Sequence, residues 1–224
     1  MNSACSCRCA HLPAGEHFFV ERVSTVVQSV SLLDEQAIRR ALTRIAHEVV
    51  EKTEDDWPLA IVGIMRKGLP LARRLAERIE AIEKRKVNVY SLDVTAYRDD
   101  QKQREGATAF AASGSFEPSA LAGVPELGRS RVLLVDDVLY TGRTVRAALD
   151  ALLSHARPPV IQLAVLIDRG HRELPIRPDY VGKNIPTARS ERVLVRLREF
   201  DSEEQVILLK QTDARAEVSG GVMK

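Results

Sequence analysis

Residues 132–144 concentrate the side chains of this 224-residue chain that are best suited to chemistry. An apolar run at 132–135 predicts a buried strand, which leads directly into Asp136 and Asp137. Carboxylates beside a buried strand cost free energy unless partners or a ligand use them. Ligands of open α/β sheets lie beyond the carboxyl ends of the strands, which is where this acidic pair is expected.

The turn after the acidic pair is suited to bind a phosphate group. Residues 140–144 place two threonine hydroxyls and a glycine at the expected start of a helix. A helix N-terminus offers backbone N–H groups and the positive end of the helix dipole to an anion. Carboxylates for sugar hydroxyls or magnesium beside a phosphate cradle indicate a phosphorylated sugar. The alternative is a capped helix preceded by solvated acids.

Alternating apolar and amphipathic segments predict the elements that position these residues. Apolar runs predict strands at 59–64, 87–94, 132–135 and 160–167. Apolar residues at helical spacing predict helices that begin at Asp34 and end near Thr53, and that cover about 70–82 and 145–153. Such alternation is typical of a parallel sheet covered on both faces. Weaker strands near 180–185, 193–197 and 206–209 have no helices between them and predict a small β appendage.

Composition and charge exclude several classes of protein. Hydrophobic residues make up 45% and charged residues 29%, so a wholly disordered chain is excluded. The net charge is only +2, and any nucleic-acid site must therefore come from a local basic surface. The longest apolar run, 160–167, is too short to span a bilayer, and no apolar signal segment lies at the start. We expect a cytoplasmic protein without membrane contact.

The two ends of the chain and one long internal stretch have no folding pattern. Residues 1–30 are expected to be a disordered extension, followed by one domain at 31–210 and a tail at 211–224. The Gly-, Ala-, Ser- and Pro-rich stretch at about 95–130 predicts a flexible loop of the kind that forms lids or binding segments. Cys5, Cys7 and Cys9 are too few and too terminal for a disulfide framework. A zinc site that includes His11 would need a second ligand pair, which the sequence does not offer.

Four segments of the chain resemble a known family. Residues 132–144, Val-Leu-Leu-Val-Asp-Asp-Val-Leu-Tyr-Thr-Gly-Arg-Thr, resemble the signature with which type I phosphoribosyltransferases bind 5-phosphoribosyl 1-pyrophosphate (PRPP). Residues 33–48, 97–100 and 167–186 resemble PyrR, the pyrimidine operon regulatory proteins with uracil phosphoribosyltransferase activity. The resemblance implies an α/β type I phosphoribosyltransferase fold, a central parallel sheet flanked by helices, with a small β hood at about 168–205.

The resemblance also implies which residues act in the enzyme. Asp136 and Asp137 would hold the ribose hydroxyls of PRPP, directly or through water bound to Mg²⁺, with no direct protein ligand to the metal. Arg98 would join them as a catalytic residue on the flexible loop. The implied PRPP and nucleotide site consists of Arg66, Lys67, Val138, Leu139, Tyr140, Thr141, Gly142, Arg143 and Thr144. Arg169 and Val193 would contact the base.

The turn at 65–68 is implied to take the pyrophosphate, although it departs from the more familiar Thr-Arg-Gly form. Either Arg66 or Lys67 would then supply the positive charge. The reaction is displacement at the anomeric carbon of PRPP through an oxocarbenium-like transition state. Neutralising the leaving pyrophosphate with magnesium and basic residues matters more in such a reaction than a strong base.

The base is expected to be a pyrimidine, because Tyr140 stands where hypoxanthine-type relatives place an acid that serves the purine N7. Uracil has no N7. The implied products are uridine monophosphate (UMP) and pyrophosphate.

A local basic surface supports a second activity on RNA. Residues 169–192 carry six Lys or Arg against three acids, and Arg40, Arg44 and His47 share a face of the first helix. Such a surface binds phosphates, while hydroxyl and imidazole groups can reach the bases of an RNA loop. The resemblance implies an RNA-binding set of Thr43, His47, Arg172, Arg177 and Lys183. Its target would be the leader mRNA of the pyrimidine operon, with UMP or UTP as co-repressor.

The leading interpretation is therefore a uracil phosphoribosyltransferase that also regulates pyrimidine genes, acting as a homodimer or higher homo-oligomer. Three alternatives stay open. One is a nucleotide-sensing RNA-binding regulator with negligible enzyme activity, one a salvage enzyme without an RNA role, and one a purine transferase.

Overall fold

The computed structural model describes residues 25–52, 57–97 and 125–213. Contacts divide the chain into a compact unit, Val27–Gln211, and a second unit of the terminal segments Met1–Val26 and Thr212–Lys224. Only residues 25–26 and 212–213 of that second unit lie within the described ranges.

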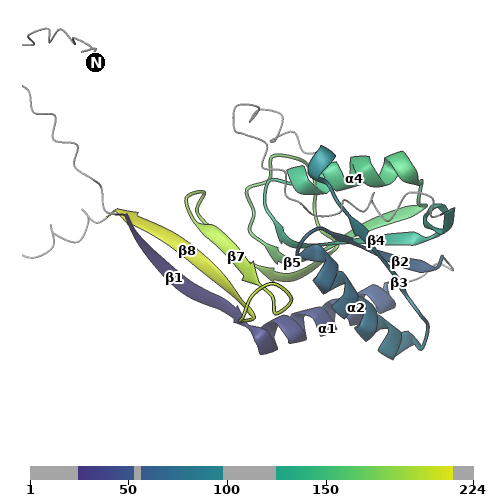
Figure 1. The fold of residues 1–224 in the computed structure, drawn as a ribbon, viewed down its shortest axis with the longest axis horizontal. Coiled ribbons are helices and arrows are strands. Elements are labelled where there is room, and N and C mark those ends of the chain that lie inside the picture. The colour runs from purple at the N-terminus through teal and green to yellow at the C-terminus, as the bar shows by residue number, and fades with distance from the viewer. Residues whose placement is uncertain (1–24, 53–56, 98–124, 214–224) are drawn as a thin grey trace, which may run out of the picture. The chain divides into compact units, whose positions relative to one another are not determined.

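A five-stranded parallel sheet forms the centre of the compact unit (Figure 1). Its strands lie in the order β3-β2-β4-β5-β6. Their bounds are β2 Leu59–Ile64, β3 Asn88–Leu92, β4 Arg131–Leu139, β5 Val160–Asp168 and β6 Tyr180–Asn184. The predicted strands at 59–64, 87–94, 132–135 and 160–167 are thus confirmed, with ends shifted by a few residues.

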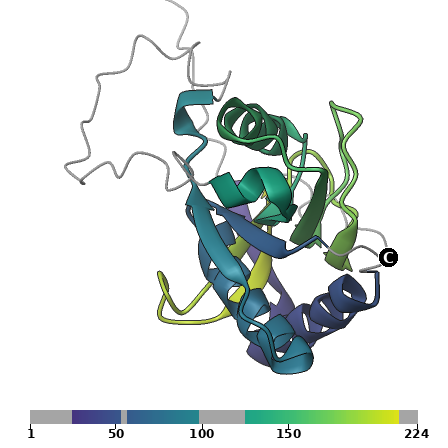
Figure 2. The ribbon, with the colours of Figure 1, turned by 90° about the vertical axis from the view of Figure 1, so that its right-hand side faces the viewer.

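Helices cover both faces of this sheet, as the alternation of segments predicted. Helices α1 (Glu35–Glu51) and α2 (Gly68–Glu83) pack on one face, and α4 (Arg143–His155) packs on the other (Figure 2). Short 3-10 turns at Thr95–Tyr97 and Pro125–Arg129 flank the stretch that the sequence predicts to be a long loop. Among the described residues, no helix combines the length and apolar character that crossing a membrane requires.

Helix α1 begins and ends close to the predicted residues. Asp34 caps it, and its carboxylate accepts a hydrogen bond of 2.7 Å from the Ala37 N–H. Its apolar side, including Ile38, Ile45 and Val49, is buried against the sheet and α2. The opposite side, which carries Arg40, Thr43, Arg44 and His47, is exposed.

Strand β4 is longer than predicted, so the acidic pair lies within the end of the strand and not after it. Its pairing with β5 continues past the apolar run, joining Asp136 to Val165 and Leu139 to Asp168. A parallel partner of equal length therefore holds both carboxylates at defined positions on the edge of the sheet.

The predicted β appendage is wrong in its composition. The second sheet has the order β1-β8-β7, made of β1 (Thr25–Asp34), β8 (Gln205–Asp213) and β7 (Arg192–Arg196). Strand β6 instead joins the main sheet, because Tyr180 is buried in the core and Gly182 allows the Leu166 carbonyl oxygen within 2.4 Å of where a Cβ would lie.

The first part of strand β1, residues 25–30, lies in the stretch that the sequence assigned to a disordered extension, which is wrong for these residues. Its partner β8 lies near the other end of the sequence, so no local sequence pattern predicts that the two strands pair. Removal of residues 1–30, which the sequence alone predicts to be a disordered extension, would delete more than half of this strand.

Candidate functional site

The acidic pair lies at the carboxyl end of β4, where backbone groups of the strand hold it. Asp136 is 7% exposed, and its carboxylate accepts a hydrogen bond of 2.9 Å from the Asp137 N–H. The Asp137 carboxylate in turn accepts one of 2.8 Å from the Val138 N–H. Burial raises the pKa of Asp137, and the positive charge of Lys67 works against this rise. The pair is thus placed to gain from a ligand that offers hydroxyl groups or positive charge.

The turn after β4 encloses a hollow of about 270 Å³. It is lined by Asp136, Val138, Leu139, Tyr140, Thr141, Gly142, Arg143, Thr144 and Val145. Most residues that the sequence assigned to a PRPP site therefore surround one space. We call this space the nucleotide hollow.

Gly142 shapes this hollow because its φ of 92° lies in the left-handed region that favours glycine. It is the N-cap of α4 and makes no side-chain bond to the helix, while the Thr141 Oγ1 accepts a long hydrogen bond of 3.4 Å from the Arg143 N–H. The first N–H groups of a helix need acceptors from outside it, and a phosphate can supply them.

The turn between β2 and α2 approaches the same end of the sheet. At Gly68 an added Cβ would lie 2.3 Å from the Val135 carbonyl oxygen, so only glycine lets α2 start this close to β4. The Lys67 ammonium donates a hydrogen bond to the Val195 carbonyl of β7, whereas Arg66 is exposed. The two candidate pyrophosphate residues thus differ: Lys67 is held by the second sheet, and Arg66 reaches solvent.

Tyr140 is surrounded by the two side chains that follow β5. The Arg169 guanidinium lies 4.1 Å from the centre of the Tyr140 ring, and the His171 ring meets it edge-on at 5.9 Å. Arg169 is 7% exposed and donates hydrogen bonds to Thr187 and to the Ala188 and Glu191 carbonyls. These contacts connect the turn at 140–144, which we call the phosphate turn, to the segment before β7.

The other predicted base contact and the predicted lid residue are not in this group. Val193 lies on β7 opposite Leu208, packs against the main core and does not line the nucleotide hollow. Arg98 lies outside the described residues.

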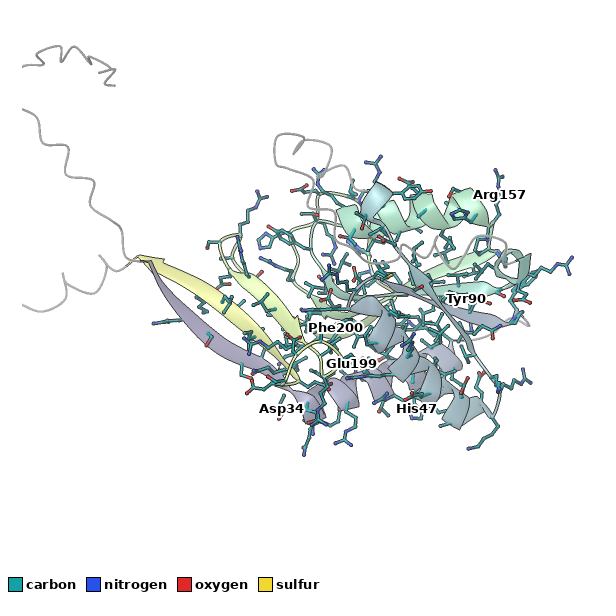
Figure 3. The ribbon with its side chains drawn as sticks, in the orientation of Figure 1. Asp34, His47, Tyr90, Arg157, Glu199 and Phe200 are labelled. Atoms are coloured by element: carbon teal, nitrogen blue, oxygen red, sulfur yellow. The ribbon has the colours of Figure 1, made fainter. Side chains whose placement is uncertain are left out.

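The exposed side of α1 forms a second candidate site. It lines an open hollow of about 500 Å³ with Gln36, Arg39, Arg40, Thr43, Arg44 and His47 (His47 is labelled in Figure 3). The Arg44 guanidinium donates hydrogen bonds of 2.7 and 2.8 Å to the Val181 and Gly182 carbonyls of β6. The helix face therefore continues into β6, where Lys183 is exposed.

A neighbouring hollow of about 340 Å³ is lined by Asp168, Gly170, Arg172, Arg177, Pro178 and Val181. Because Val181 also binds Arg44, this hollow adjoins the α1 face. We call the two hollows together with Lys183 the basic surface. Thr43, His47, Arg172, Arg177 and Lys183, the predicted RNA-binding set, all belong to this surface.

Within this set the side chains differ in how they are engaged. Arg177 and His47 are exposed, and the Lys183 ammonium reaches the Leu32 carbonyl at 3.1 Å. The Thr43 hydroxyl donates to the Arg39 carbonyl. Arg172 is only 21% exposed, and its guanidinium is surrounded by hydrogen-bond acceptors.

Sequence reasoning missed several residues that hold the two sites in place. The Arg143 guanidinium forms an ion pair of 2.9 Å with Glu173, which lies beside the phosphate turn only in the folded chain. Arg74 of α2 binds both Glu199 and Glu204, which fastens the β7–β8 connection to α2 (Figure 3 labels Glu199). These partners lie 30 or more residues apart, and no sequence spacing predicts them.

Two carboxylates beside the nucleotide hollow suit a hydrated magnesium ion. No group of three or more metal-binding side chains occurs among the described residues. Mg²⁺ keeps several waters and is usually held by one or two carboxylates and the phosphates of a substrate. Asp136 lines the hollow and Asp137 is its neighbour in the chain, so both provide that type of oxygen at this end of β4.

Known proteins resemble the chain over most of its length. Residues 28–197 match the phosphoribosyl transferase domain family. The chain is 60% identical over 171 residues to the bifunctional protein PyrR of Brevibacillus brevis. The alignment covers 76% of this chain and 90% of that protein. Its identity to the bifunctional protein PyrR of Bacillus subtilis is 53% over 183 residues, covering 81% and 97%.

Solved structures of purine transferases share the fold. Hypoxanthine phosphoribosyltransferase from Staphylococcus aureus gives a TM-score of 0.55 at 21% identity, over 80% of this chain and 90% of that one. The HGPRT-ase of Leishmania tarentolae in complex with GMP gives 0.58 at 18%, over 81% and 97%.

The parallel sheet, its two layers of helices and the hollow at the end of β4 define a type I phosphoribosyltransferase fold. Within that class, identities of 50–60% over most of the sequence place the chain more narrowly. It belongs to the PyrR family, which confirms the resemblance found in its motifs.

Proposed function

We propose that this chain transfers the phosphoribosyl group of PRPP to uracil and, when it holds a uridine nucleotide, binds the leader mRNA of pyrimidine genes. The observation that best supports the enzyme activity is the nucleotide hollow, where an acidic strand end meets a helix start whose N-cap, Gly142, makes no side-chain bond to the helix. The relatives' name, bifunctional protein PyrR, supports two activities in one chain.

In the proposed complex the 5-phosphate occupies the turn at 141–144. Backbone N–H groups and threonine hydroxyls donate to it, because the N-cap Gly142 makes no side-chain bond to α4 and the Thr141 Oγ1 accepts a long bond of 3.4 Å from the Arg143 N–H. Asp136 and Asp137 then accept hydrogen bonds from the ribose hydroxyls, directly or through water on Mg²⁺. The metal, when bound with PRPP, supplies positive charge to the departing pyrophosphate.

Arg66 is the proposed side chain for pyrophosphate. It is exposed at the turn before α2, whereas the Lys67 ammonium is occupied by the Val195 carbonyl, and its charge opposes the burial that raises the pKa of Asp137. Lys67 therefore reduces the cost of a negative charge on Asp137 beside the ribose, and Arg66 neutralises the leaving group. Arg98, the third proposed catalytic residue, lies outside the described residues.

For the base, Tyr140 and Arg169 are the proposed neighbours. The Arg169 guanidinium already stacks on the Tyr140 ring, and it donates hydrogen bonds to Thr187 and to the segment before β7. A uracil ring would thus meet a stacked pair whose position the protein sets in advance. Val193 does not line the nucleotide hollow, so any contact that it makes with the base would come from β7.

The basic surface is the proposed RNA site, with exposed Arg177, His47 and Lys183 as direct contacts. Phosphate contacts of this kind give affinity that falls with salt, while bases of a loop are read by hydroxyl and imidazole groups. We place the protein in the cytoplasm as a homo-oligomer, with UMP or UTP as its effector.

The test of the enzyme is UMP formation from uracil, PRPP and Mg²⁺, measured beside the Asp137→Asn variant. Product that needs all three components and disappears in the variant is the expected result. No product above that of the variant would leave only a nucleotide-sensing regulator. Conversion of hypoxanthine or guanine in the same assay would contradict the choice of uracil.

The test of the RNA site is a gel shift with a stem-loop from the pyrimidine-biosynthesis leader of the same genome. Binding that UMP strengthens is the expected result. Synthesis of UMP without such binding would identify a salvage enzyme with no RNA role.

A further inference from the structure

One segment of the chain, residues 170–178, touches both the nucleotide hollow and the basic surface. We propose that Arg172 within it is a positioning residue that couples nucleotide binding to RNA binding, and is not itself an RNA contact. This inference rests on the function proposed above and names how the two sites communicate.

Toward the nucleotide hollow, the segment forms hydrogen bonds to the backbone of the phosphate turn. The Arg172 Nη1 donates a hydrogen bond of 2.8 Å to the Tyr140 carbonyl. The N–H groups of Glu173 and Leu174 donate to the Thr141 carbonyl at 3.0 and 3.3 Å. Tyr140 and Thr141 both line the nucleotide hollow, so a ligand that moves this turn also moves the segment.

An ion pair beside these contacts is open to exchange with a phosphate. Arg143 lines the nucleotide hollow and pairs with Glu173 at 2.9 Å, with the two side chains 56% and 45% exposed. Exposed pairs of this kind contribute little to stability. A nucleotide phosphate at the turn offers Arg143 a doubly charged partner, and charge-assisted bonds to phosphate are stronger. Nucleotide binding would thus release Glu173, the residue next to Arg172.

On its outer side the same arginine lines the basic surface. Arg172 shares the hollow of about 340 Å³ with Arg177 and Pro178. Its Nε donates to the Ile176 carbonyl at 3.0 Å, directly before Arg177, and its Nη2 binds Asp168 at 2.6 Å. One guanidinium therefore fixes the phosphate turn and the backbone that presents Arg177.

These bonds occupy all three guanidinium nitrogens of Arg172. Arginine–phosphate pairs are frequently bidentate, and such a pair takes two donors directed outward. Arg177 is exposed at the end of the same segment and is better placed for that contact. The geometry thus divides the work, with Arg172 holding the segment and Arg177 meeting the RNA.

Coupling of this kind has a measurable form. If UMP strengthens RNA binding through the segment, RNA strengthens UMP binding by the same factor, and such factors are commonly about fivefold or more. The coupling depends on the several N–H donors that the planar guanidinium of Arg172 directs at once to different acceptors. A lysine keeps the positive charge but lacks this planar set of donors. Arg172→Lys should therefore lose the factor although it keeps the positive charge.

The experiment measures the affinity of the leader stem-loop with and without UMP, over a range of salt, for wild type, Arg172→Lys, Arg172→Gln and Arg177→Gln. Both Arg172 variants should bring the ratio of affinities with and without UMP close to one and leave the salt slope unchanged. Arg177→Gln, the control, should keep the ratio and reduce the slope by about 0.7–0.9, the value of one phosphate contact.

Glu173→Gln provides a second route that leaves the guanidinium of Arg172 in place. It breaks the ion pair with Arg143 in advance, so RNA affinity without UMP should rise and the effect of UMP should shrink. This variant decides the matter if the Arg172 variants fail to fold.

Two results would overturn the inference alone. One is a wild-type ratio in Arg172→Lys or Glu173→Gln, and the other is a salt slope in Arg172→Gln reduced as in Arg177→Gln. A wild-type protein that binds the RNA without any response to UMP, or does not bind it, would overturn the proposed regulatory function and the coupling with it.

Discussion

The nucleotide hollow and the basic surface are built in opposite ways. Every residue that lines the hollow comes from one continuous stretch at the end of β4 and the start of α4. The basic surface collects exposed side chains from α1, β6 and the segment at 170–178. A site that buries a carboxylate and fixes a backbone turn needs neighbouring residues in a set order. A surface that attracts phosphates needs only charge on the same side of the fold.

The largest expected effect falls on the hollow alone. Asp137→Asn keeps the shape of the side chain but removes the charge beside the ribose and Mg²⁺. Loss of one such electrostatic contact lowers kcat by about 100- to 1000-fold. UMP synthesis measures this, and RNA binding without nucleotide should stay as in wild type.

Asp150→Asn is the matched control, because Asp150 is exposed on α4 and pairs only loosely with Arg146 at 3.7 Å. It should leave synthesis unchanged. Equal loss of RNA binding in Asp137→Asn would show that the two regions are not separable.

The backbone of the hollow should be nearly as sensitive as its charges. At Gly142 an alanine would keep ordinary contacts, with Ile176 at 3.5 Å, but would adopt a φ of 92°. A left-handed L-residue costs about 1–2 kcal/mol. If the turn relaxes to avoid this cost, the affinity for the 5-phosphate falls by about tenfold per 1.4 kcal/mol. The KM for PRPP in Gly142→Ala measures the change.

Gly128→Ala is the control for that variant, since nothing lies within 4 Å of its added Cβ and its φ is not positive. A KM unchanged in Gly142→Ala would mean that the turn does not cradle the phosphate.

The basic surface should lose affinity in smaller steps. Arg177→Ala removes one exposed charge, so the slope of log affinity against log salt should fall by about 0.7–0.9. UMP synthesis should not change, because Arg177 does not line the nucleotide hollow. Arg157→Ala, on an exposed residue after α4, is the control for nonspecific loss of charge (Figure 3). An equal slope for both variants would mean that RNA binding has no defined location.

The same contrast explains what the sequence could predict. An acidic strand end followed by a phosphate-binding turn could be expected at 132–144, because strand, turn and helix start follow one another and each has its own signal. The family resemblance then implied the individual residues, of which Asp136 and residues 138–144 line the hollow. The basic surface was predicted as a set of residues only through the family resemblance. Its charges alone are common on any solvated helix.

What the sequence could not predict are contacts between distant residues. Strand β1 pairs with β8 from the far end of the chain, and β6 joins the main sheet because of one buried tyrosine and one glycine. The bond from Lys67 to the Val195 carbonyl spans 128 residues, and it is what distinguishes Lys67 from Arg66. Such pairs become visible only when the sheet brings them together.

The smallest expected effect concerns stability, and it again separates the two regions. Burial raises the pKa of Asp137, so the folded protein binds this proton more tightly than the unfolded chain does. Stability contributed by the site therefore falls as pH rises from the ordinary carboxyl range through the raised pKa.

Asp137→Asn removes that penalty and should melt at a higher temperature than wild type at neutral pH, with a difference that vanishes in acid. For a chain of this size each 1 kcal/mol corresponds to about 2–4 °C in Tm. Thermal melts across pH measure the difference. For Asp150→Asn, on the exposed side of α4, the difference in Tm from wild type should not increase with pH.

A variant that is less stable than wild type at neutral pH would mean that Lys67 and the Val138 N–H more than offset the burial of the carboxylate. The hollow would then be a stabilising feature of the fold, whereas the predicted gain would mean that the protein gives up stability to keep a charge where the ribose binds.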